Sequence, residues 1–303
     1  QNHILVKKIK MNYLQKRYYR IIQSVAKKIT KIKNSSKDEK FKKAIRSALY
    51  SEKSNKDEIM LSINKKRKLL VFNSDWNSKK LFIDEKFDEE TLFKALKILK
   101  KNNSMKTLVN IGAHIGRICI PALQKGFFEK CICFEPINKN YNLLVSNIFL
   151  NGLSSRVKLY NLALSNKKSK LLMKKFTNSG DQRIVKKKYR NSEIVDSDIL
   201  DKYTKSLNSK NSLIFMDVQG HEPTVFKGSK KTIRKKIPIV FEFSPKLLEK
   251  KWLNGFKLLF KNYNYFYDLR YIKIKNKFNK VNLLNLFNEL KTKKIDYTDL
   301  LIV

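Results

Sequence analysis

Glycine is scarce in this sequence, and that scarcity makes each glycine informative. The 303 residues include only eight glycines. Because glycine weakens helices and strands, a chain that uses it so sparingly should place it where a side chain cannot fit. No run of 18 apolar residues occurs, which excludes a transmembrane helix. Apolar residues still make up 42% of the chain, enough for a substantial core.

Cysteine is equally rare, with only Cys119, Cys131 and Cys133. Cys131 and Cys133 lie two residues apart in an apolar, strand-like stretch, so their side chains share one face. This arrangement suits buried thiols in a reducing compartment better than a disulfide. A structural zinc site needs a further pair of cysteine or histidine ligands, and the sequence offers none. We therefore expect a cytoplasmic protein without a metal site.

Acidic residues are the third shortage. The chain has 26 Asp and Glu against 67 Lys and Arg, which gives a formal net charge of +41. Only ten of the basic residues are arginine, the residue that reads bases and phosphates in a bidentate manner, so the charge is weak evidence for nucleic-acid recognition. A surface this basic should nevertheless attract a polyanion such as RNA, anionic lipid or acidic glycan.

The chain divides into two regions of different texture. Residues 1–60 are rich in lysine, contain no glycine and carry apolar residues at helical spacing, as in Ile21, Ile22, Val25 and Ile29. They predict a Lys-rich helical extension. Residues 61–303 instead alternate between short apolar runs and amphipathic stretches. That alternation predicts an α/β domain, in which helices cover a parallel sheet.

The apolar pattern predicts the following elements in this domain. Strands are expected at 68–72, 80–83, 106–111, 130–135, 156–164, 212–218, 237–243 and 297–303. Helices are expected at 88–101, 115–125 and 138–151, from about residue 222, and through residue 260. In such a sheet, ligands bind beyond the carboxyl ends of the strands.

The segment LVNIGAHIG (108–116) places two of the eight glycines, Gly112 and Gly116, just after a predicted strand. A ligand lying across this turn would need bare backbone, and the following helix start would offer free N–H donors. The next strand ends in Glu135, where an acid can accept hydrogen bonds from both hydroxyls of a ribose. The fingerprint G-x-G-x-x-G is incomplete, which disfavours a pyrophosphate and indicates S-adenosylmethionine. A purely structural turn with an unrelated glutamate is the alternative.

Six blocks then occur in an order that resembles the FkbM-type methyltransferases. They are LVNIGAHIG, FEPINKNYNLLVSNIFLNG, VKLYNLALS, GDQRI, IFMDVQGHEPTVFKGS and IPIVFEFSP, and the resemblance extends from about residue 61 to the C-terminus. It implies a class I methyltransferase (Rossmann-like) fold, with a seven-stranded, mostly parallel sheet whose last strand is antiparallel. It also implies methyl transfer from S-adenosylmethionine, usually to a hydroxyl of a sugar, glycan or secondary metabolite.

The resemblance also implies a set of residues that bind the cofactor. Gly112, Ala113 and Gly116 would line its methionine and ribose side, and Glu135 would hold the ribose hydroxyls. Ala163 would lie near the adenine, and Asp181 would face the cofactor. The remaining position is Asn110, where the family usually has aspartate; an asparagine still accepts one hydrogen bond from the cofactor's ammonium group.

Three residues are candidates for catalysis. Asp217 ends the predicted strand 212–218, where the mouth of a ligand cleft is expected, and His221 and Glu222 begin the next helix. A base that removes the proton of a hydroxyl acceptor assists methyl transfer, and histidine has an ordinary pKa near neutrality. Each of these residues could instead have a purely structural role, since histidines and acids at helix starts often bind the backbone or interact with the helix dipole. Glu242 is a further candidate for substrate contact.

Three hypotheses about function remain open at this point. The first is O-methylation of a small molecule or glycan. The second is RNA methylation, motivated by the charge and by the lysine clusters at 186–188 and 230–236. The third is a diverged, non-catalytic binding protein. It is motivated by Asn110 and by Gln219, which stands where the family pattern D-x-E-G-x-E has its first glutamate.

Overall fold

The computed structural model describes residues 43–47, 50, 59–64, 67–72, 75–84, 89–101, 105–249, 251–271 and 274–303. The chain forms two compact units, residues 1–53 and 54–303. Most of the predicted helical extension, residues 1–60, lies outside the described residues, although residues 43–47 are helical. Within the described part of the chain, no helix is long and apolar enough to cross a membrane.

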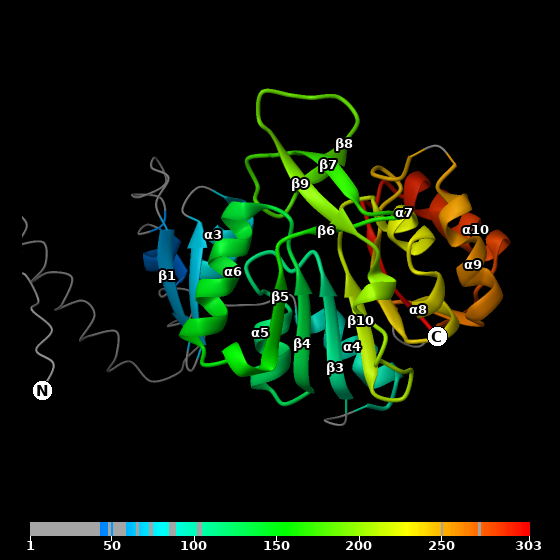
Figure 1. Ribbon diagram of the computed structural model, residues 1–303, viewed down its shortest axis with the longest axis horizontal. Coiled ribbons are helices and arrows are strands. Elements are labelled where there is room, and N and C mark those ends of the chain that lie inside the picture. The colour runs from blue at the N-terminus through cyan, green and yellow to red at the C-terminus, as the bar shows by residue number, and fades with distance from the viewer. Residues whose placement is uncertain are drawn as a thin grey trace, which may run out of the picture. The chain divides into compact units, whose positions relative to one another are not determined.

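The second unit is built on an eight-stranded sheet (Figure 1). Across the sheet its strands are β13 (Lys275–Lys277), β12 (Tyr265–Asp268), β14 (Thr298–Ile302), β11 (Ile239–Phe243), β10 (Ser212–Met216), β3 (Met105–Ile111), β4 (Phe128–Phe134) and β5 (Val157–Tyr160). The five strands from β11 to β5 run parallel, and β14 pairs antiparallel with β11. The predicted parallel sheet with an antiparallel last strand is confirmed. The predicted number of seven strands is wrong by one, because the three-residue strand β13 is added at the edge next to β12.

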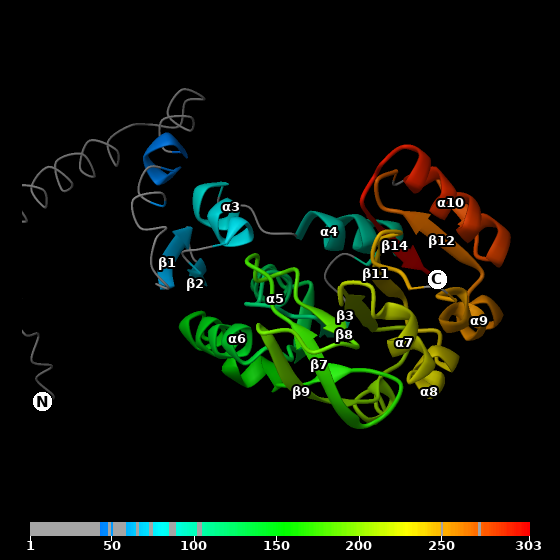
Figure 2. The same cartoon turned by 90° about the horizontal axis from the view of Figure 1, so that it is seen from above.

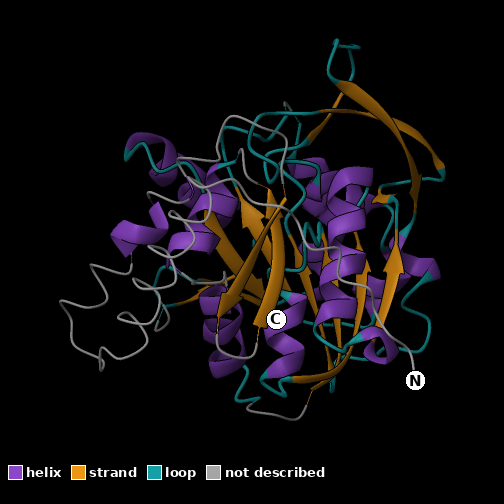
Figure 3. Ribbon diagram, turned by 90° about the vertical axis from the view of Figure 1, so that its left-hand side faces the viewer, coloured by secondary structure: helices purple, strands orange, loops and turns teal. Residues whose placement is uncertain are grey.

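Helices cover both faces of this sheet (Figure 3). On one face lie α4 (Glu89–Ile98), α5 (Cys119–Gln124) and α6 (Asn138–Leu150), and on the other α7 (Glu222–Lys227), α8 (Lys230–Arg234), α9 (Leu253–Asn262) and α10 (Lys280–Thr292). Successive residues of β3 serve the two faces in turn, since Leu108 packs in the first core and Val109 in the second. Burial on both faces explains why β10 is apolar after its first residue.

A second, four-stranded sheet lies over the carboxyl ends of the parallel strands (Figure 1; seen from above in Figure 2). It consists of β6 (Ala163–Leu164), β9 (Ser192–Asp198), β7 (Ser169–Lys174) and β8 (Arg183–Val185), in that order. The prediction of one strand over 156–164 is therefore wrong. The chain leaves the main sheet after Tyr160, and Leu164 pairs with Asp198 of β9 instead.

A helix also replaces the strand predicted at 80–83. Residues Trp76–Asp84 form α3, after the antiparallel hairpin of β1 (Ile59–Asn64) and β2 (Arg67–Phe72). The buried carboxylate of Asp75 accepts a hydrogen bond from the backbone N–H of Ser78 at 2.6 Å. An acid that binds the N–H three residues on is the usual start of a helix, so Asp75 sets the conformation of this segment.

The glycine-rich turn after β3 has its own physical reason. Gly112 has φ +77°, and a Cβ at this position would overlap the carbonyl oxygen of Asp217. Gly116 has φ +98°, and a Cβ there would lie 2.7 Å from Cδ1 of Ile120. The room that glycine provides is thus used by the protein's own backbone and core. The helix predicted at 115–125 begins only at Cys119, because these turns occupy the residues before it.

We expect Gly112→Ala to destabilise the fold strongly, and Gly126→Ala to serve as its matched control. Both glycines have positive φ, but nothing lies within 4 Å of a Cβ at Gly126. Gly126→Ala should therefore cost only the left-handed strain of about 1–2 kcal/mol. Gly112→Ala should lose a further 1–3 kcal/mol, roughly, through overpacking against Asp217. Chemical denaturation measures both, and equal losses would contradict the close approach.

Candidate active site

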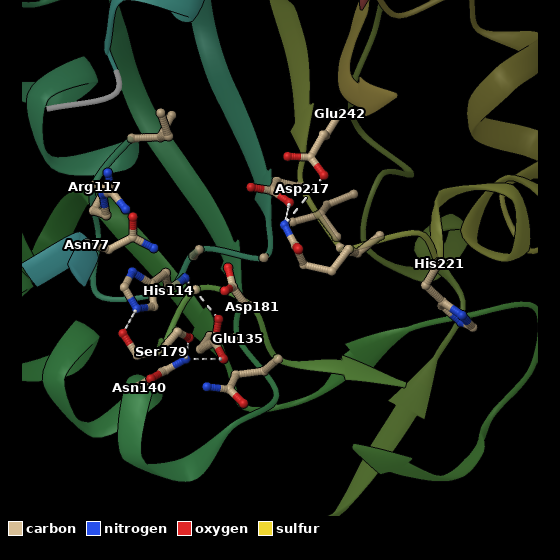
Figure 4. Close-up of a pocket in the computed structure, with 18 of the residues that line it drawn as sticks. Asn77, His114, Arg117, Glu135, Asn140, Ser179, Asp181, Asp217, His221 and Glu242 are labelled. Atoms are coloured by element: carbon tan, nitrogen blue, oxygen red, sulfur yellow. Dashed lines mark hydrogen bonds between the residues drawn. The ribbon is translucent and has the colours of Figure 1, made fainter. Parts of the chain in front are cut away.

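A cavity of about 670 Å³ opens at the carboxyl ends of the parallel strands, under the second sheet. Its size falls within the range of small-molecule sites, which runs from about 300 to 1,000 Å³. The residues expected to form the site converge here from distant parts of the sequence (Figure 4). Those that line it are Gly112, Ala113, Glu135, Ala163, Asp181, Asp217 and His221. The other three predicted residues, Asn110, Gly116 and Glu222, are not part of its lining.

Glu135 is held in one orientation at the end of β4. Its Oε1 accepts hydrogen bonds from the Ile137 N–H at 3.0 Å and from Nδ2 of Asn140 at 3.3 Å. Its Oε2 accepts one from the His114 N–H at 2.9 Å. Burial raises the pKa of Glu135 to about 7, against the opposing effect of these hydrogen bonds. The carboxyl group thus titrates near neutrality while facing the cavity.

The N–H groups of the glycine turn are occupied within the protein. Gly112 and Ala113 both donate to the carbonyl oxygen of Phe134, at 3.0 and 2.9 Å, and Gly116 donates to the carbonyl of Ala113. These three N–H groups of the turn are therefore not free to bind a ligand. These bonds instead tie the loop after β3 to the end of β4, and they fix its position relative to Glu135.

A polar network that the sequence did not reveal supports this loop. His114 has φ +50°, and its Nε2 lies 2.7 Å from Oγ of Ser179, which in turn donates to the carboxylate of Asp75. Burial lowers the pKa of His114 to about 3, with a smaller contribution from the charge of Arg117, so its ring is neutral. The buried Nδ1 of His114 has no hydrogen-bond partner among the described residues. This ring nitrogen of His114 thus remains available beside the cavity.

A row of carboxyl groups lies at the other end of the cavity. Glu242 of β11 pairs in register with Asp299 of β14, and Asp217 directly follows Met216 at the end of β10. Gln219 bridges two of these acids: its Nε2 donates to Asp217 at 2.8 Å and lies 3.5 Å from Oε1 of Glu242. Figure 4 shows Asp217 and Glu242 together, apart from His114 and Glu135.

Glu242 stays protonated in this row. Burial raises its pKa to about 10, and the charges of Asp217, Glu222, Asp299 and Asp181 add to the shift in that order. A carboxyl group with so high a pKa is protonated near neutral pH and can donate a hydrogen bond.

The other predicted catalytic residues have different surroundings. Nε2 of His221 lies 3.1 Å from Oγ of Ser165, burial lowers its pKa to about 4, and Figure 4 shows its ring pointing away from Asp217. Glu222 is 2% exposed, and its Oε1 accepts a hydrogen bond from the Val218 N–H at 2.9 Å. Burial raises the pKa of Glu222 to about 8. Of the three, Asp217 is the residue that joins the carboxyl row in the cavity.

Asn110 lies in β3, one residue before the end of the strand, and is 1% exposed. Its Oδ1 is buried and has no hydrogen-bond partner among the described residues. An unpartnered buried carbonyl is costly, but Asn110 does not line the cavity, so the structure does not bring this oxygen to a ligand there.

The three cysteines form a separate, fully buried group under α5. Their sulfur atoms all lie within 4.8 Å of one another, and Sγ of Cys131 is 3.4 Å from Sγ of Cys133. All three are free thiols, and burial raises the pKa of Cys131 and Cys133. Three donors are one short of a tetrahedral zinc set, and no fourth histidine, cysteine or carboxylate joins them in the described part of the chain.

The strand order and the cavity define a class I, Rossmann-like methyltransferase fold. The family model for the methyltransferase FkbM domain matches residues 110–277, more than half of the chain, and the chain belongs to this family. S-adenosylmethionine is the methyl donor of the family. A comparison with curated protein sequences gives no match.

Solved structures of methyltransferases resemble this chain at low identity. The methyltransferase FkbM from Methylobacillus flagellatus KT is 12% identical, with 86% of this chain and 58% of that chain covered and a TM-score of 0.37. TYW2 of P. horikoshii, solved with MeSAdo, is 14% identical, with 88% and 85% covered and a TM-score of 0.36. The M1A22 tRNA methyltransferase TrmK of B. subtilis is 8% identical, with 72% and 65% covered and a TM-score of 0.37. The chain thus spans little more than half the length of the Methylobacillus protein.

The cavity suits the donor chemically. S-adenosylmethionine carries positive charge on its sulfonium and ammonium groups. The cavity is lined by seven acidic side chains and by four basic side chains of lysine or arginine. The acids are Glu90, Glu135, Asp181, Asp217, Glu242, Asp296 and Asp299. The cavity is therefore locally acidic in a chain of net charge +41.

We expect the affinity for S-adenosylmethionine to rise with pH through neutrality. The pKa of Glu135 is about 7, so its carboxyl is protonated at pH 6 and ionised at pH 8. If the ionised form accepts the ribose hydroxyls, Kd should fall by about tenfold between pH 6 and pH 8. Calorimetry of the wild type and of Glu135→Gln measures this.

The Glu135→Gln variant should bind more weakly at pH 8 and lose the pH dependence of Kd. A pH dependence of equal size in wild type and variant would show that the titrating group is another residue, and would remove the ribose assignment of Glu135.

Proposed function

We propose that this protein transfers the methyl group of S-adenosylmethionine to a hydroxyl oxygen of a sugar, glycan or secondary metabolite. The observation that carries the proposal is the row of carboxyl groups in the cavity, where Gln219 joins Asp217, just after β10, to Glu242 of β11. Asn110, Gly112, Ala113, Gly116, Glu135, Ala163 and Asp181 are the residues proposed to hold the cofactor. Glu135 would hold the ribose hydroxyls, and Asn110 would accept from the ammonium group.

Asp217 is the proposed general base. The sulfonium supplies an already activated methyl group, so the protein's main task is to align the acceptor oxygen for in-line displacement. A carboxylate at the end of β10 can accept the hydroxyl proton as the new O–C bond forms. Glu242 is protonated and cannot take this role, and Gln219 holds one Asp217 oxygen at 2.8 Å.

The other two candidates take secondary positions in this proposal. Nε2 of His221 lies 3.1 Å from Oγ of Ser165 and its ring points away from Asp217 (Figure 4), so His221 would contact the cavity rather than take the proton. Glu222 would brace the turn that carries Gln219, because its carboxyl binds the Val218 N–H.

The acceptor end of the cavity favours a neutral, hydroxyl-rich molecule. Asp217 and Asp299 line the cavity there, and such acids accept hydrogen bonds from hydroxyl groups but repel phosphate. Two exposed aromatic rings, Trp76 and Tyr297, also line the cavity. Flat apolar rings beside hydrogen-bonding acids suit a sugar ring or a macrocycle.

RNA is the second candidate acceptor, and the net charge of +41 favours it. The lysine clusters give it weaker support. Nζ of Lys235 donates to three carbonyl oxygens, those of Thr204, Lys205 and Leu207. Lys186 pairs with Glu249. In both cases the lysine charge that would bind a phosphate backbone already has a partner within the protein.

Asp217→Asn should reduce turnover by roughly 10²–10⁴-fold, the usual contribution of a positioned base. The amide keeps the size of the side chain but cannot accept the proton, so Kd for S-adenosylmethionine and the melting temperature should change little. Glu222→Gln is the matched control and should retain most of the turnover. Wild-type turnover in Asp217→Asn would place the base elsewhere, with His221 as the next residue to test.

The acceptor class can be tested with labelled S-adenosylmethionine and separate pools of glycans, polyhydroxylated metabolites and RNA. We expect label in the glycan or metabolite pool that Asp217→Asn abolishes. Label in RNA alone would establish the second candidate. Absence of cofactor binding by calorimetry would instead indicate a non-catalytic member of the family.

A further inference from the structure

Gln219 lies just after β10, and its side chain contacts two acids of the cavity. It has φ +53° and precedes Gly220 with φ +91°, so the chain turns back over the strand ends directly after Asp217. This turn brings the Gln219 side chain between the acids of two neighbouring strands. Its single Nε2 reaches both Asp217, at 2.8 Å, and Glu242, at 3.5 Å.

The surroundings of this bridge are densely acidic. The carboxyl groups that face Glu242 come from β14 (Asp299), from the turn before β8 (Asp181) and from the start of α7 (Glu222). Asp217 also raises the pKa of Glu135, across the cavity. A glutamate at position 219 would add another negative charge next to Asp217. It would also replace the N–H groups that now join Asp217 to Glu242 with a second acceptor.

We infer that Gln219 is a positioning residue, whose amide holds the Asp217 carboxyl group beside Glu242 in the cavity. A glutamine at this position then serves the arrangement of the crowded acids rather than disabling the site. The consequence for proton transfer rests on the proposed function, whereas the bridge itself does not.

Two variants separate the contributions of charge and hydrogen bonding. Gln219→Glu restores the family's residue, and Gln219→Met keeps the approximate length without a donor or a charge. Asn77→Asp is the matched control, because it adds a carboxylate to the cavity wall on α3, away from Asp217 in Figure 4. The three variants and the wild type are compared by thermal unfolding at pH 5.5 and pH 8.5.

The sign of the expected effect follows from linkage. In Gln219→Glu, one carboxyl of the row gains a raised folded-state pKa, so stability is lost as pH rises above its unfolded value. The decrease in Tm relative to wild type should therefore be larger at pH 8.5 than at pH 5.5. The difference should be about 3–5 °C for each unit by which this pKa exceeds 5.5, for a domain of this size. Gln219→Met should lose Tm about equally at both pH values, and Asn77→Asp should show no such pH dependence.

The pH profile of turnover supplies a second, independent readout. In Gln219→Glu the acidic limb, which reports ionisation of Asp217, should move to higher pH by at least one unit, with Kd for the cofactor nearly unchanged. An unmoved limb together with a pH-independent Tm loss would overturn the inference. If the Tm result is as predicted but Asp217→Asn retains full turnover, the bridge stands and the proposed role of Asp217 as base fails.

Discussion

The close approach of Gly112 to the carbonyl oxygen of Asp217 is the constraint on which the rest of the site depends. It joins the loop after β3, which faces the cofactor cavity, to the end of β10, which carries the proposed base. Hydrogen bonds from the same loop to the end of β4 fix Glu135 as well. The three strand ends therefore form one rigid edge. A reaction that depends on aligning a methyl donor with an oxygen acceptor needs such an edge.

The net charge of the whole chain and the charge of the cavity lining have opposite signs. Across the whole chain the charge is +41, and lysine supplies most of it. Seven of the chain's 26 acidic residues line the cavity, against four basic residues. An acidic cavity suits a cationic cofactor. The charge of the whole chain is thus a poor guide to what its cavity binds.

Long apolar patterns made most of the main sheet predictable, together with the helices at α4 and α6. The helix α3 could not be recognised in the same way, because its start depends on the buried Asp75. The second sheet was missed because its strands are short, with two residues in β6 and three in β8, and because β6 pairs with β9 across 34 positions of the sequence. The same limit applies to the site. The glycines and acids carry local signals, but the contact of His114 with Ser179 spans 65 residues and has none.

A crystal structure of this protein with S-adenosylhomocysteine, the demethylated product, would test most directly whether the cofactor binds between Glu135 and Asp217. We expect the product to bind in the cavity at the carboxyl ends of β3, β4 and β10, with the ribose hydroxyls on the Glu135 carboxylate. The product's sulfur should face the row formed by Asp217 and Glu242. Product bound elsewhere, or bound in this cavity with its sulfur turned away from Asp217, would contradict the proposed binding of the cofactor and the proposed role of Asp217.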